Sequence, residues 1–386
     1  VADAAVTAVS FEEFKGEAMA MGEKTPIAVS NAAAASRMAI GEALTNLVSA
    51  DVNLDRIILS ANWMGACGVK GQDAALYDGV SAASSFCQEL GVSIPVGKDS
   101  LSMKTSWKDQ AGEAKTVVSP VSLVVSAAAP VYDIRNNLLP MFAESVRDSS
   151  LLLIDLGHGK DRLGGSVYSQ VTQRFDSVTP DMEDPKELKK FLELIRSLSA
   201  KGAILAYHDR SDGGLAAALC EMMFASHVGV EIVADALVSK DRTLNQALFN
   251  EELGAVIQVA RGRAAEVERD FEAAGMGWSL KYLGNLTQDD HLNIYLEGKC
   301  VLSEDRVDLQ KAWNEVSWQI ARMRDNPECV DSEYELISDK HNGGLVLTMG
   351  FDPEENLAAP FINTGVRPKG AILREQGVNS QNEMAS

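Results

Sequence analysis

The sequence lacks the marks of secreted, zinc-binding and membrane-spanning proteins. Its five cysteines, among 386 residues, lie far apart, form no C-x-x-C pair and have no histidine at zinc-ligand spacing. Neither a disulfide framework nor a zinc site is predicted, and reduced, buried thiols are expected. No apolar run approaches the length of about 20 residues that crosses a bilayer, and residues 1–4 do not begin a secretory signal. We therefore expect a cytoplasmic protein with no membrane partner.

Basic residues are also scarce. Lysine and arginine total 35, against 55 for aspartate and glutamate, which gives a net charge of −20. Such a chain does not attract a nucleic-acid backbone nonspecifically, so no nucleic-acid partner is expected. A nucleotide bound to so acidic a protein would need a divalent cation between its phosphates and the carboxylates. It would also need amide donors from glycine-rich turns.

Hydrophobic residues make up 46% of the chain, which can bury a core in roughly two or three folding units. No short repeat or low-complexity tract is present. Periodicity predicts a first unit that mixes helices and strands. Its expected helices cover 32–47 and 73–90, its expected strands cover 57–60, 92–96 and 117–127, and residues 130–149 are expected to connect it to a second unit.

A second unit is predicted to begin with a short apolar run, 151–156, that is typical of a buried strand. After the loop 157–165, we expect strands at 203–206, 228–233 and 254–259, a hairpin at 297–298, and helices at 185–198, 215–225, 264–274 and 308–324. Residues 325–368 are expected to be irregular, and 371–374 to begin another strand. This order favours two α/β or α+β subdomains, each a sheet covered by helices.

The helix predicted over 32–47 carries a candidate metal half-site. It is apolar nearly all round, which indicates burial, and Glu42 and Asn46 lie four residues apart on one of its faces. Mg²⁺ prefers carboxylate and amide oxygens together with phosphate and water. The alternative is a buried carboxylate paired with a lysine or arginine from another element.

Two loops that run from a strand to a helix are candidate anion sites. In the loop 207–214, amides meet a positive helix terminus, and Asp209 is a candidate metal ligand. Ser211 or Asp212 could instead cap the following helix, which is the better default for Asp212. The glycine-rich loop 157–166 permits close approach to a phosphate and is equally consistent with an ordinary turn.

Two polar clusters, 97–100 and 250–252, lie between strand-like runs. Their side chains are candidate ligands, and the clusters are equally consistent with solvated turns. No catalytic residue is predicted, because the histidines form no triad that spacing supports. From these clusters and the glycine-rich loop, the candidate substrate contacts are Lys98, Asp99, Ser100, Gly164, Gly165, Ser166, Asn250 and Glu251.

Five segments, taken together and in order, resemble one enzyme family. They are GEALTN at 41–46, LSANWM at 59–64, IPVGKDSLSMK at 94–104, AYHDRSDGG at 206–214 and LFNEELGAVIQV at 248–259. The chain thereby resembles the large, single-chain form of phosphoribosylformylglycinamidine synthase. Residues 367–380 are similar to the start of that family's glutaminase domain, so we expect the chain to be an internal piece of a longer protein.

The resemblance implies a fold that combines α/β and α+β units. Residues 1–132 would form a second, ferredoxin-like N-type subdomain. Residues 145–305 would form a C-type α/β subdomain of the aminoimidazole ribonucleotide synthetase superfamily. A helix and connector would follow at 306–368, and the start of a truncated glutaminase domain at 369–386.

The resemblance also implies a set of ligand contacts. Asp3, Glu42, Asn46 and Asp209 would bind Mg²⁺, and Ala2 and Ser211 would contact ATP or ADP. None of the five cysteines matches the glutaminase nucleophile of the family. The expected partners are a missing N-terminal half of the synthetase, the downstream glutaminase domain and a small-molecule substrate.

The family reaction is an ATP-dependent amidation in de novo purine biosynthesis. Phosphate from ATP activates the amide oxygen of formylglycinamide ribonucleotide, and ammonia released from glutamine displaces that phosphate to give the amidine. We expect this chain to supply part of that ligase and to be inactive alone. The rival hypotheses are a noncatalytic scaffold half that binds a structural nucleotide and docks the glutaminase, and a self-sufficient dimer like aminoimidazole ribonucleotide synthetase.

Overall fold

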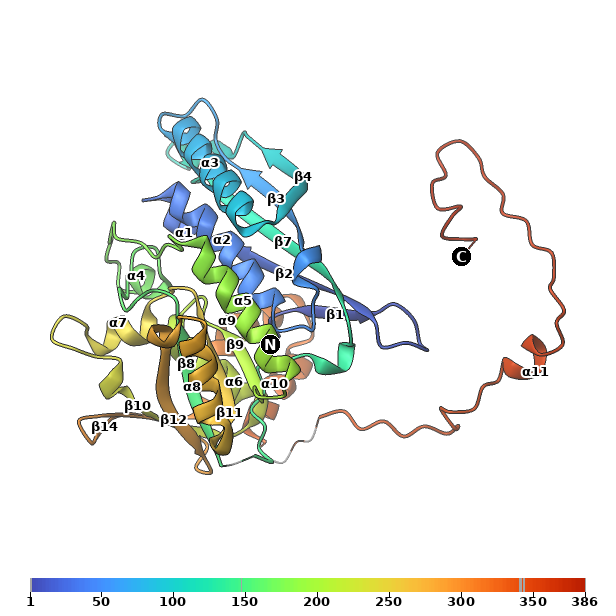
Figure 1. Ribbon diagram of the computed structural model, residues 1–386. Coiled ribbons are helices and arrows are strands. Elements are labelled where there is room, and N and C mark those ends of the chain that lie inside the picture. The colour runs from blue at the N-terminus through green and yellow to red at the C-terminus, as the bar shows by residue number, and fades with distance from the viewer. Residues whose placement is uncertain (1, 147, 340–341, 343, 386) are drawn as a thin grey trace. The chain divides into compact units, whose positions relative to one another are not determined.

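The computed structural model describes residues 2–146, 148–339, 342 and 344–385. Its residues divide into two compact units, Val1–Ser338 and Asp339–Ser386. The first unit contains a five-stranded sheet, a seven-stranded sheet and a two-stranded ribbon (Figure 1). In the second unit the described residues form one short helix, α11 (Ala359–Ile362).

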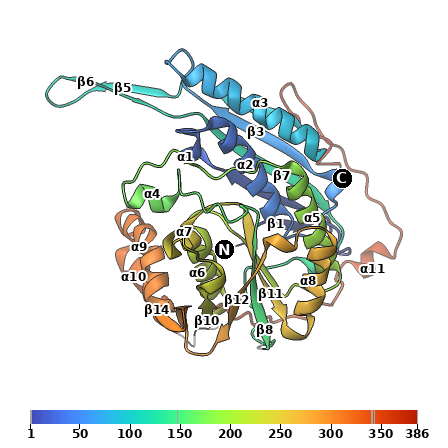
Figure 2. The same ribbon diagram turned by 60° about the vertical axis from the view of Figure 1, so that its left-hand side comes forward.

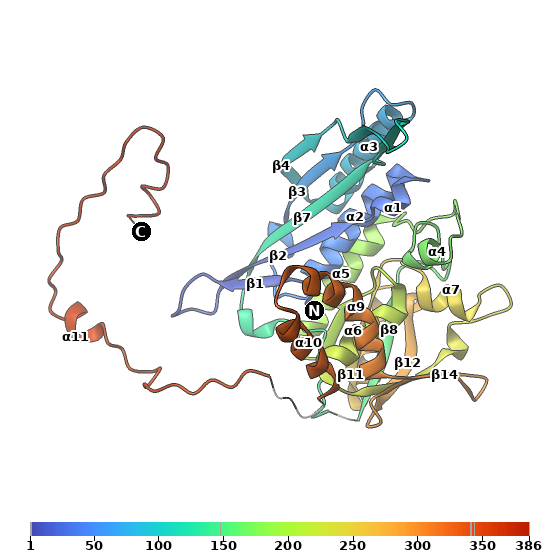
Figure 3. The same cartoon turned by 180° about the vertical axis from the view of Figure 1, so that it is seen from behind.

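The five-stranded sheet carries two long helices on one face. Its elements are β1 (Ala5–Ala8), β2 (Gly16–Glu23), β3 (Ile58–Met64), β4 (Ser93–Ser100), β7 (Ser122–Val131), α2 (Ala32–Leu47) and α3 (Gln72–Leu90). The strand order is β1-β2-β7-β3-β4, in which β3 and β4 are parallel and the other neighbours antiparallel. Seen from behind, the strands lie in front of these helices (Figure 3).

Helix α2 is the most deeply buried element of this layer. Asn31 caps it by accepting a hydrogen bond from the Ala34 amide at 2.9 Å. Its alanines and leucines let it pack closely on β2, whose residues alternate between buried and exposed. A short helix, α1 (Thr25–Ala28), joins β2 to α2. The consequence is that Glu23 and Lys24, at the end of β2, lie beside the middle of α2.

A ribbon extends from the far end of the sheet. It consists of β5 (Lys104–Lys108) and β6 (Ala114–Val118), which pair as an antiparallel hairpin. Figure 2 shows it projecting beyond β3 and α3.

The seven-stranded sheet has helices on both faces. Its strands are β8 (Ser149–Asp155), β9 (Ala206–Asp209), β10 (Gly229–Val233), β11 (Gly254–Ala260), β12 (Leu280–Thr287), β13 (His291–Leu296) and β14 (Lys299–Asp305), in the order β14-β13-β10-β12-β8-β11-β9. Its helices are α4 (Val167–Val171), α5 (Pro185–Ala200), α6 (Gly214–Ser226), α7 (Leu244–Phe249) and α8 (Ala264–Ala273).

Alternate residues of the buried strand β8 serve two different cores. Leu152 and Ile154 pack in a cluster that includes α5, α8 and the whole five-stranded layer, so one core runs through both sheets. Leu151 and Leu153 pack on the other face with α6. The polar contacts between the layers include a hydrogen bond of 2.7 Å from the buried Tyr207 hydroxyl to the Thr45 carbonyl.

A helical hairpin follows the second sheet. Helix α9 (Arg306–Arg324) packs against α6 and is joined to α10 (Pro327–Glu335), with the rings of Trp318 and Tyr334 stacked 4.5 Å apart. Among the described residues, none of the helices combines the length and the apolar character that a bilayer crossing needs.

The main helices agree with the sequence prediction, but several local expectations are wrong. Residues 327–335 form α10 instead of an irregular connector, and 371–374 form no strand. Pro120 divides the predicted strand 117–127 between β6 and β7. The expected loop residues Tyr207, His208 and Asp209 belong to β9, and 97–100 belong to β4.

The cysteines also differ from expectation. Cys87 is buried as predicted, whereas Cys67, Cys300 and Cys329 are exposed. Strands β1, β2 and β12 were not predicted, because their alternation is short or interrupted by small residues.

The close packing of β2 on α2 can be tested at Gly22. A Cβ atom there would lie 2.1 Å from the Ala39 carbonyl oxygen, whereas one at Gly41 would meet the flexible side chain of Leu253. We expect Gly22→Ala to lower the free energy of unfolding by about 3 kcal/mol and Gly41→Ala by about 1 kcal/mol or less. The helix propensity of alanine offsets part of the second loss. Urea denaturation measures both, and equal losses would contradict this packing argument.

Candidate functional site

The candidate site lies where the start of the chain and helix α2 meet the segment that runs from β9 into α6. Strand β9 carries His208 and Asp209, and residue Asp3 precedes β1. The Asp3 carboxylate accepts a hydrogen bond from the Asp209 amide at 3.0 Å and contacts His208 Nδ1 at 2.8 Å. These contacts bring together two aspartates that are 206 residues apart in the sequence.

The two aspartates leave buried oxygens without a partner. Asp3 Oδ2 and Asp209 Oδ2 are inaccessible and accept no hydrogen bond in the described part of the chain. Ligand atoms of Asp3, His208 and Asp209 lie within 4.8 Å of one another. Unsatisfied buried carboxylate oxygens are costly, and a hard cation such as Mg²⁺ binds such oxygens, so the two aspartates fit a divalent cation.

The charge of Asp209 is poorly stabilised without such a cation. Burial raises the pKa of Asp209 well above its ordinary value, and the neighbouring Asp3 and Glu42 carboxylates raise it further, against the opposing effect of His208. A bound divalent cation would favour the ionised carboxylate.

His208 supplies a fixed positive charge beside the two aspartates. Burial tends to lower its pKa, but hydrogen bonds to Asp3 and Glu221 outweigh this effect and raise the pKa to about 10. Its Nε2 atom lies 2.8 Å from a Glu221 oxygen. Because both ring nitrogens contact carboxylates, His208 acts here as a donor, and the oxygens are left to bind a metal.

Glu42 lies close to these groups but is already paired. Its Oε2 accepts a hydrogen bond of 2.7 Å from the Glu23 amide, and its Oε1 lies 3.3 Å from Lys24 Nζ and accepts a hydrogen bond from the Ser211 hydroxyl. The structure thus realises the lysine-paired alternative at Glu42. Asn46, one turn later, is half-buried and donates to the Met21 carbonyl at 3.2 Å.

Lys24, like His208, is a residue that sequence reasoning missed. Its side chain is 2% exposed and contacts Glu42 of its own layer at 3.3 Å and, in the other layer, Asp212 at 2.5 Å and Glu251 at 3.9 Å. Burial tends to lower its pKa, but Glu42 and the other two carboxylates raise it above the ordinary value. A lysine next to a strand end gives no signal of burial, since its partners come from distant segments.

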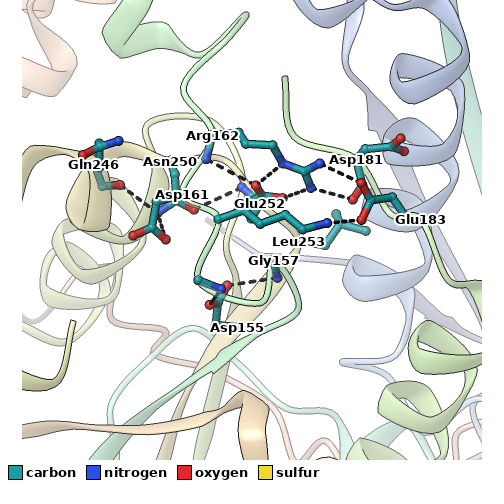
Figure 4. Close-up of polar contacts among 12 residues, drawn as sticks. Asp155, Gly157, Asp161, Arg162, Asp181, Glu183, Gln246, Asn250, Glu252 and Leu253 are labelled. Carbon is teal, nitrogen blue, oxygen red and sulfur yellow. Dashed lines mark hydrogen bonds and ion pairs between the residues drawn. The ribbon is translucent and has the colours of Figure 1, made fainter. Parts of the chain in front are cut away.

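The glycine-rich loop 157–166 is held by buried ion pairs. Asp155, at the end of β8, accepts hydrogen bonds from the Gly157 and Gly159 amides at 3.1 and 3.0 Å and pairs with Arg210 at 2.5 Å. Arg162 donates two hydrogen bonds to Glu252, at 2.6 and 2.9 Å (Figure 4). This loop is therefore attached to the end of β8 and to the segment before β11.

The pKa of Asp155 reflects these attachments. Burial opposes its ionisation, but Arg210 and the two loop amides outweigh burial and lower the pKa below its ordinary value. Asp161 pairs with Arg242 at 2.6 Å. It also accepts a hydrogen bond from Asn250 at 3.2 Å (Figure 4), and the two contacts fix the other end of the loop.

The candidate substrate residues of this loop face α1. Gly165 has φ +80, and a Cβ there would lie 2.9 Å from the Ile27 nitrogen. The Gly164 amide donates to the Val178 carbonyl at 3.0 Å, and Ser166 caps α4. Glu251 accepts hydrogen bonds from the Val167 and Gly213 amides and so joins α4 to the Lys24 cluster. A cavity of about 680 Å³ lies beside Gly165.

The other candidates lie elsewhere. Lys98, Asp99 and Ser100 belong to β4, the edge strand, which β7 and β3 separate from β2. Three strand spacings of about 4.8 Å make this roughly 14 Å. Lys98 donates to the Ser100 hydroxyl at 2.6 Å. Ala2 is exposed and precedes Asp3. Of the site residues predicted from the sequence, the structure therefore brings together Asp3, Glu42, Asp209, Ser211 and Glu251.

Comparison with known proteins accounts for both layers. Residues 1–130 match the family model of the FGAR-AT PurM_N-like domain, and residues 149–297 match that of the AIR synthase related protein, C-terminal domain. These two adjacent domains make the chain a PurM-like protein of the FGAR-AT type, with the fold of the AIR synthase superfamily. The predicted fold class is confirmed.

Solved structures share this fold. Thermotoga maritima PurL complexed with FGAR superposes with a TM-score of 0.60 at 11% identity, covering 79% of this chain and 47% of that one. The same protein complexed with ATP gives 0.57 at 13% identity, covering 78% and 45%. This chain thus spans about half of the PurL chains it matches. A chain of the HypE–HypF complex gives 0.53 at 18% identity, covering 79% and 93%.

The raised pKa of His208 predicts that the stability of the fold depends on pH. Its folded-state pKa of about 10 exceeds the ordinary 6.5, so its contribution is complete below pH 6.5 and is lost as the pH rises through about 10. We expect the free energy of unfolding to fall between these values by up to about 1.4 kcal/mol per pH unit. In His208→Gln the part of this slope that His208 contributes should be lost.

The measurement is chemical denaturation at several pH values without divalent cations. His227→Gln is the matched control, because burial lowers the pKa of His227 and places its titration below this window. An unchanged slope in His208→Gln would show that His208 is not the group responsible.

Proposed function

We propose that this chain is a nucleotide-binding part of an ATP-dependent, glutamine-using ligase that converts formylglycinamide ribonucleotide to the amidine in purine biosynthesis. The family matches and the solved PurL complexes with FGAR and ATP support this proposal. The large single-chain form, and the inactivity of the chain alone, are part of the proposal.

The observation that carries the proposal is the pair of buried carboxylate oxygens without partners, on Asp3 and Asp209. These oxygens, with Glu42 and Asn46 nearby, would hold Mg²⁺ and so form the acidic side of a Mg-nucleotide site. A bound Mg²⁺ neutralises phosphate charge. This also explains how a chain with a net charge of −20 accepts a polyanion.

Segments around the proposed ion would make the contacts to the nucleotide and to the substrate. The Ser211 hydroxyl and the backbone at Ala2 would contact the nucleotide, since they lie next to Asp209 and Asp3. The loop 157–166, with Gly164, Gly165 and Ser166, would face the substrate beside the cavity at α1. Its amide hydrogen bonds to Asp155 and its ion pair between Arg162 and Glu252 would keep the loop amides in place and exclude water.

Exposed apolar residues on the outer face of the five-stranded sheet support the proposal of a partner half. Met19, Met21, Ile58 and Val96 expose between 50% and 63% of their surface on this sheet. Lys98, Asp99 and Ser100 lie on its edge strand, so they would contribute to a site completed by the partner. Adjacent exposed apolar residues of this kind mark interaction surfaces.

The scaffold alternative also has an observation in its favour. Glu42 is engaged by Lys24, Ser211 and the Glu23 amide in a buried cluster that joins both layers. A nucleotide bound beside it would stabilise the contact between the layers and could remain bound without reacting. The two functions differ in whether the ligands are needed for turnover.

The nucleotide site can be tested by calorimetric titration with Mg·ADP. We expect saturable binding by the chain and at least about a tenfold loss in Asp209→Asn, because the variant removes a charged ligand. Asp270→Asn is the matched control, since Asp270 is a surface acid paired with Lys201. Equal binding by all three proteins would reject the assignment of Asp209.

The ligase role can be tested by mixing the chain with the expected N-terminal half and measuring amidine formation from ammonia and ATP. We expect no product from the chain alone and turnover from the mixture. If Asp209→Asn abolishes turnover in a mixture that still assembles, the site is catalytic. Assembly with full turnover in this variant would support the scaffold alternative instead.

A further inference from the structure

Lys24 holds a position that resembles a cation site. Its ammonium nitrogen lies 2.5 Å from Asp212 Oδ1, 3.2 Å from Ser211 Oγ, 3.3 Å from Glu42 Oε1 and 3.9 Å from Glu251 Oε2. These four oxygens come from α2, from the segment before α6 and from the segment after α7. Lys24 exposes 2% of its side chain, and Glu42 and Glu251 expose 9% and 3%, so water compensates little of the charge of these three groups.

Glu42 connects the four oxygens around Lys24 to the segment that carries Asp209. Glu42 pairs directly with Lys24, and it also accepts a hydrogen bond from the hydroxyl of Ser211, two residues after Asp209. The carboxylate cannot give Oε1 to a metal ion while that atom is held by the ammonium and by the Ser211 hydroxyl, and its Oε2 is held by the Glu23 amide. Binding of a divalent cation through Glu42 must therefore displace part of this arrangement.

We propose that Lys24 is a resident counter-cation that competes with the divalent metal ion for Glu42 and thereby sets the affinity of the site. The inference rests on the metal site of the proposed function and deepens it. Lys24 is a positioning residue, because it acts through Glu42 and not on the nucleotide. In its absence, the oxygens of Glu42, Glu251 and Asp212 become available to a divalent ion.

A purely structural lysine would behave differently. Removing one partner of a buried ion pair leaves an uncompensated charge and destabilises the fold whatever ions are present. A competing counter-cation, once removed, leaves a more negative site that attracts divalent ions more strongly. Stability and metal affinity therefore change in opposite directions only if Lys24 is a competitor.

The test is Mn²⁺ binding, followed by electron paramagnetic resonance of the free ion, together with thermal unfolding in EDTA and in Mg²⁺. We expect Lys24→Gln to bind Mn²⁺ at least about tenfold more tightly than the unaltered chain. Its unfolding midpoint should fall in EDTA and recover in Mg²⁺. Lys24→Arg keeps the charge and should show neither effect. Lys15→Gln, which removes an exposed lysine of the same layer, is the matched control.

A charge-balanced variant keeps the proposal testable if Lys24→Gln does not fold. Lys24→Gln combined with Asp212→Asn removes the cation and the most exposed of its carboxylates, Asp212, whose side chain is 63% exposed. Glu42 is still released from its ammonium, so we expect Mn²⁺ affinity above that of the unaltered chain. Unchanged or weaker affinity in this variant overturns the inference.

The outcomes separate the two proposals. If the unaltered chain binds Mn²⁺ and Asp209→Asn does not, the metal site stands. With that site intact, equal Mn²⁺ affinity in the unaltered chain and Lys24→Gln rejects only the competition at Glu42. If none of the proteins binds Mn²⁺, the metal site of the proposed function fails, and the inference fails with it.

Discussion

The structure depends on balancing buried charge where its two layers meet. In the described part of the chain, the carboxylates at this junction outnumber the cations that contact them. The carboxylates are Asp3, Glu42, Asp209, Glu221 and Glu251, with the more exposed Asp212 beside them, and the contacting cations are Lys24 and His208. Removing so many charges from water is costly unless they are paired or bind a metal ion. The imbalance explains both the unpartnered oxygens and the proposed divalent cation.

The fold places these charges through ordinary packing. Gly22 lets β2 approach α2 so closely that Glu23, Lys24 and Glu42 become neighbours. A core shared by both layers keeps β9 against α2, as the Tyr207 hydrogen bond shows. The loop 157–166 is attached to the same framework by ion pairs. Rigid packing therefore brings together groups that are distant in the sequence.

Part of this arrangement could be predicted from the sequence. The apolar composition of residues 32–47 correctly predicted a buried helix. The polar run after residue 206, between apolar segments, indicated a candidate site. Lys24 and His208 could not be found in this way, since periodicity does not report partners as far apart as Lys24 and Ser211, 187 residues away. For the same reason, the sequence offered two roles for Glu42, a metal ligand or the partner of a lysine or arginine, but it could not identify Lys24 as that partner. Helix α10 was missed because Pro327, a helix-starting proline, was interpreted as a breaker.

The most direct test of this account is a crystal of the chain grown with Mn²⁺ and ADP and measured at the manganese absorption edge. We expect an anomalous peak between Asp3 Oδ2 and Asp209 Oδ2, with the phosphates on its open side. A peak only at other carboxylates, with the oxygens of Asp3 and Asp209 still unpartnered, would contradict the idea that this buried charge imbalance exists to bind a metal-nucleotide complex.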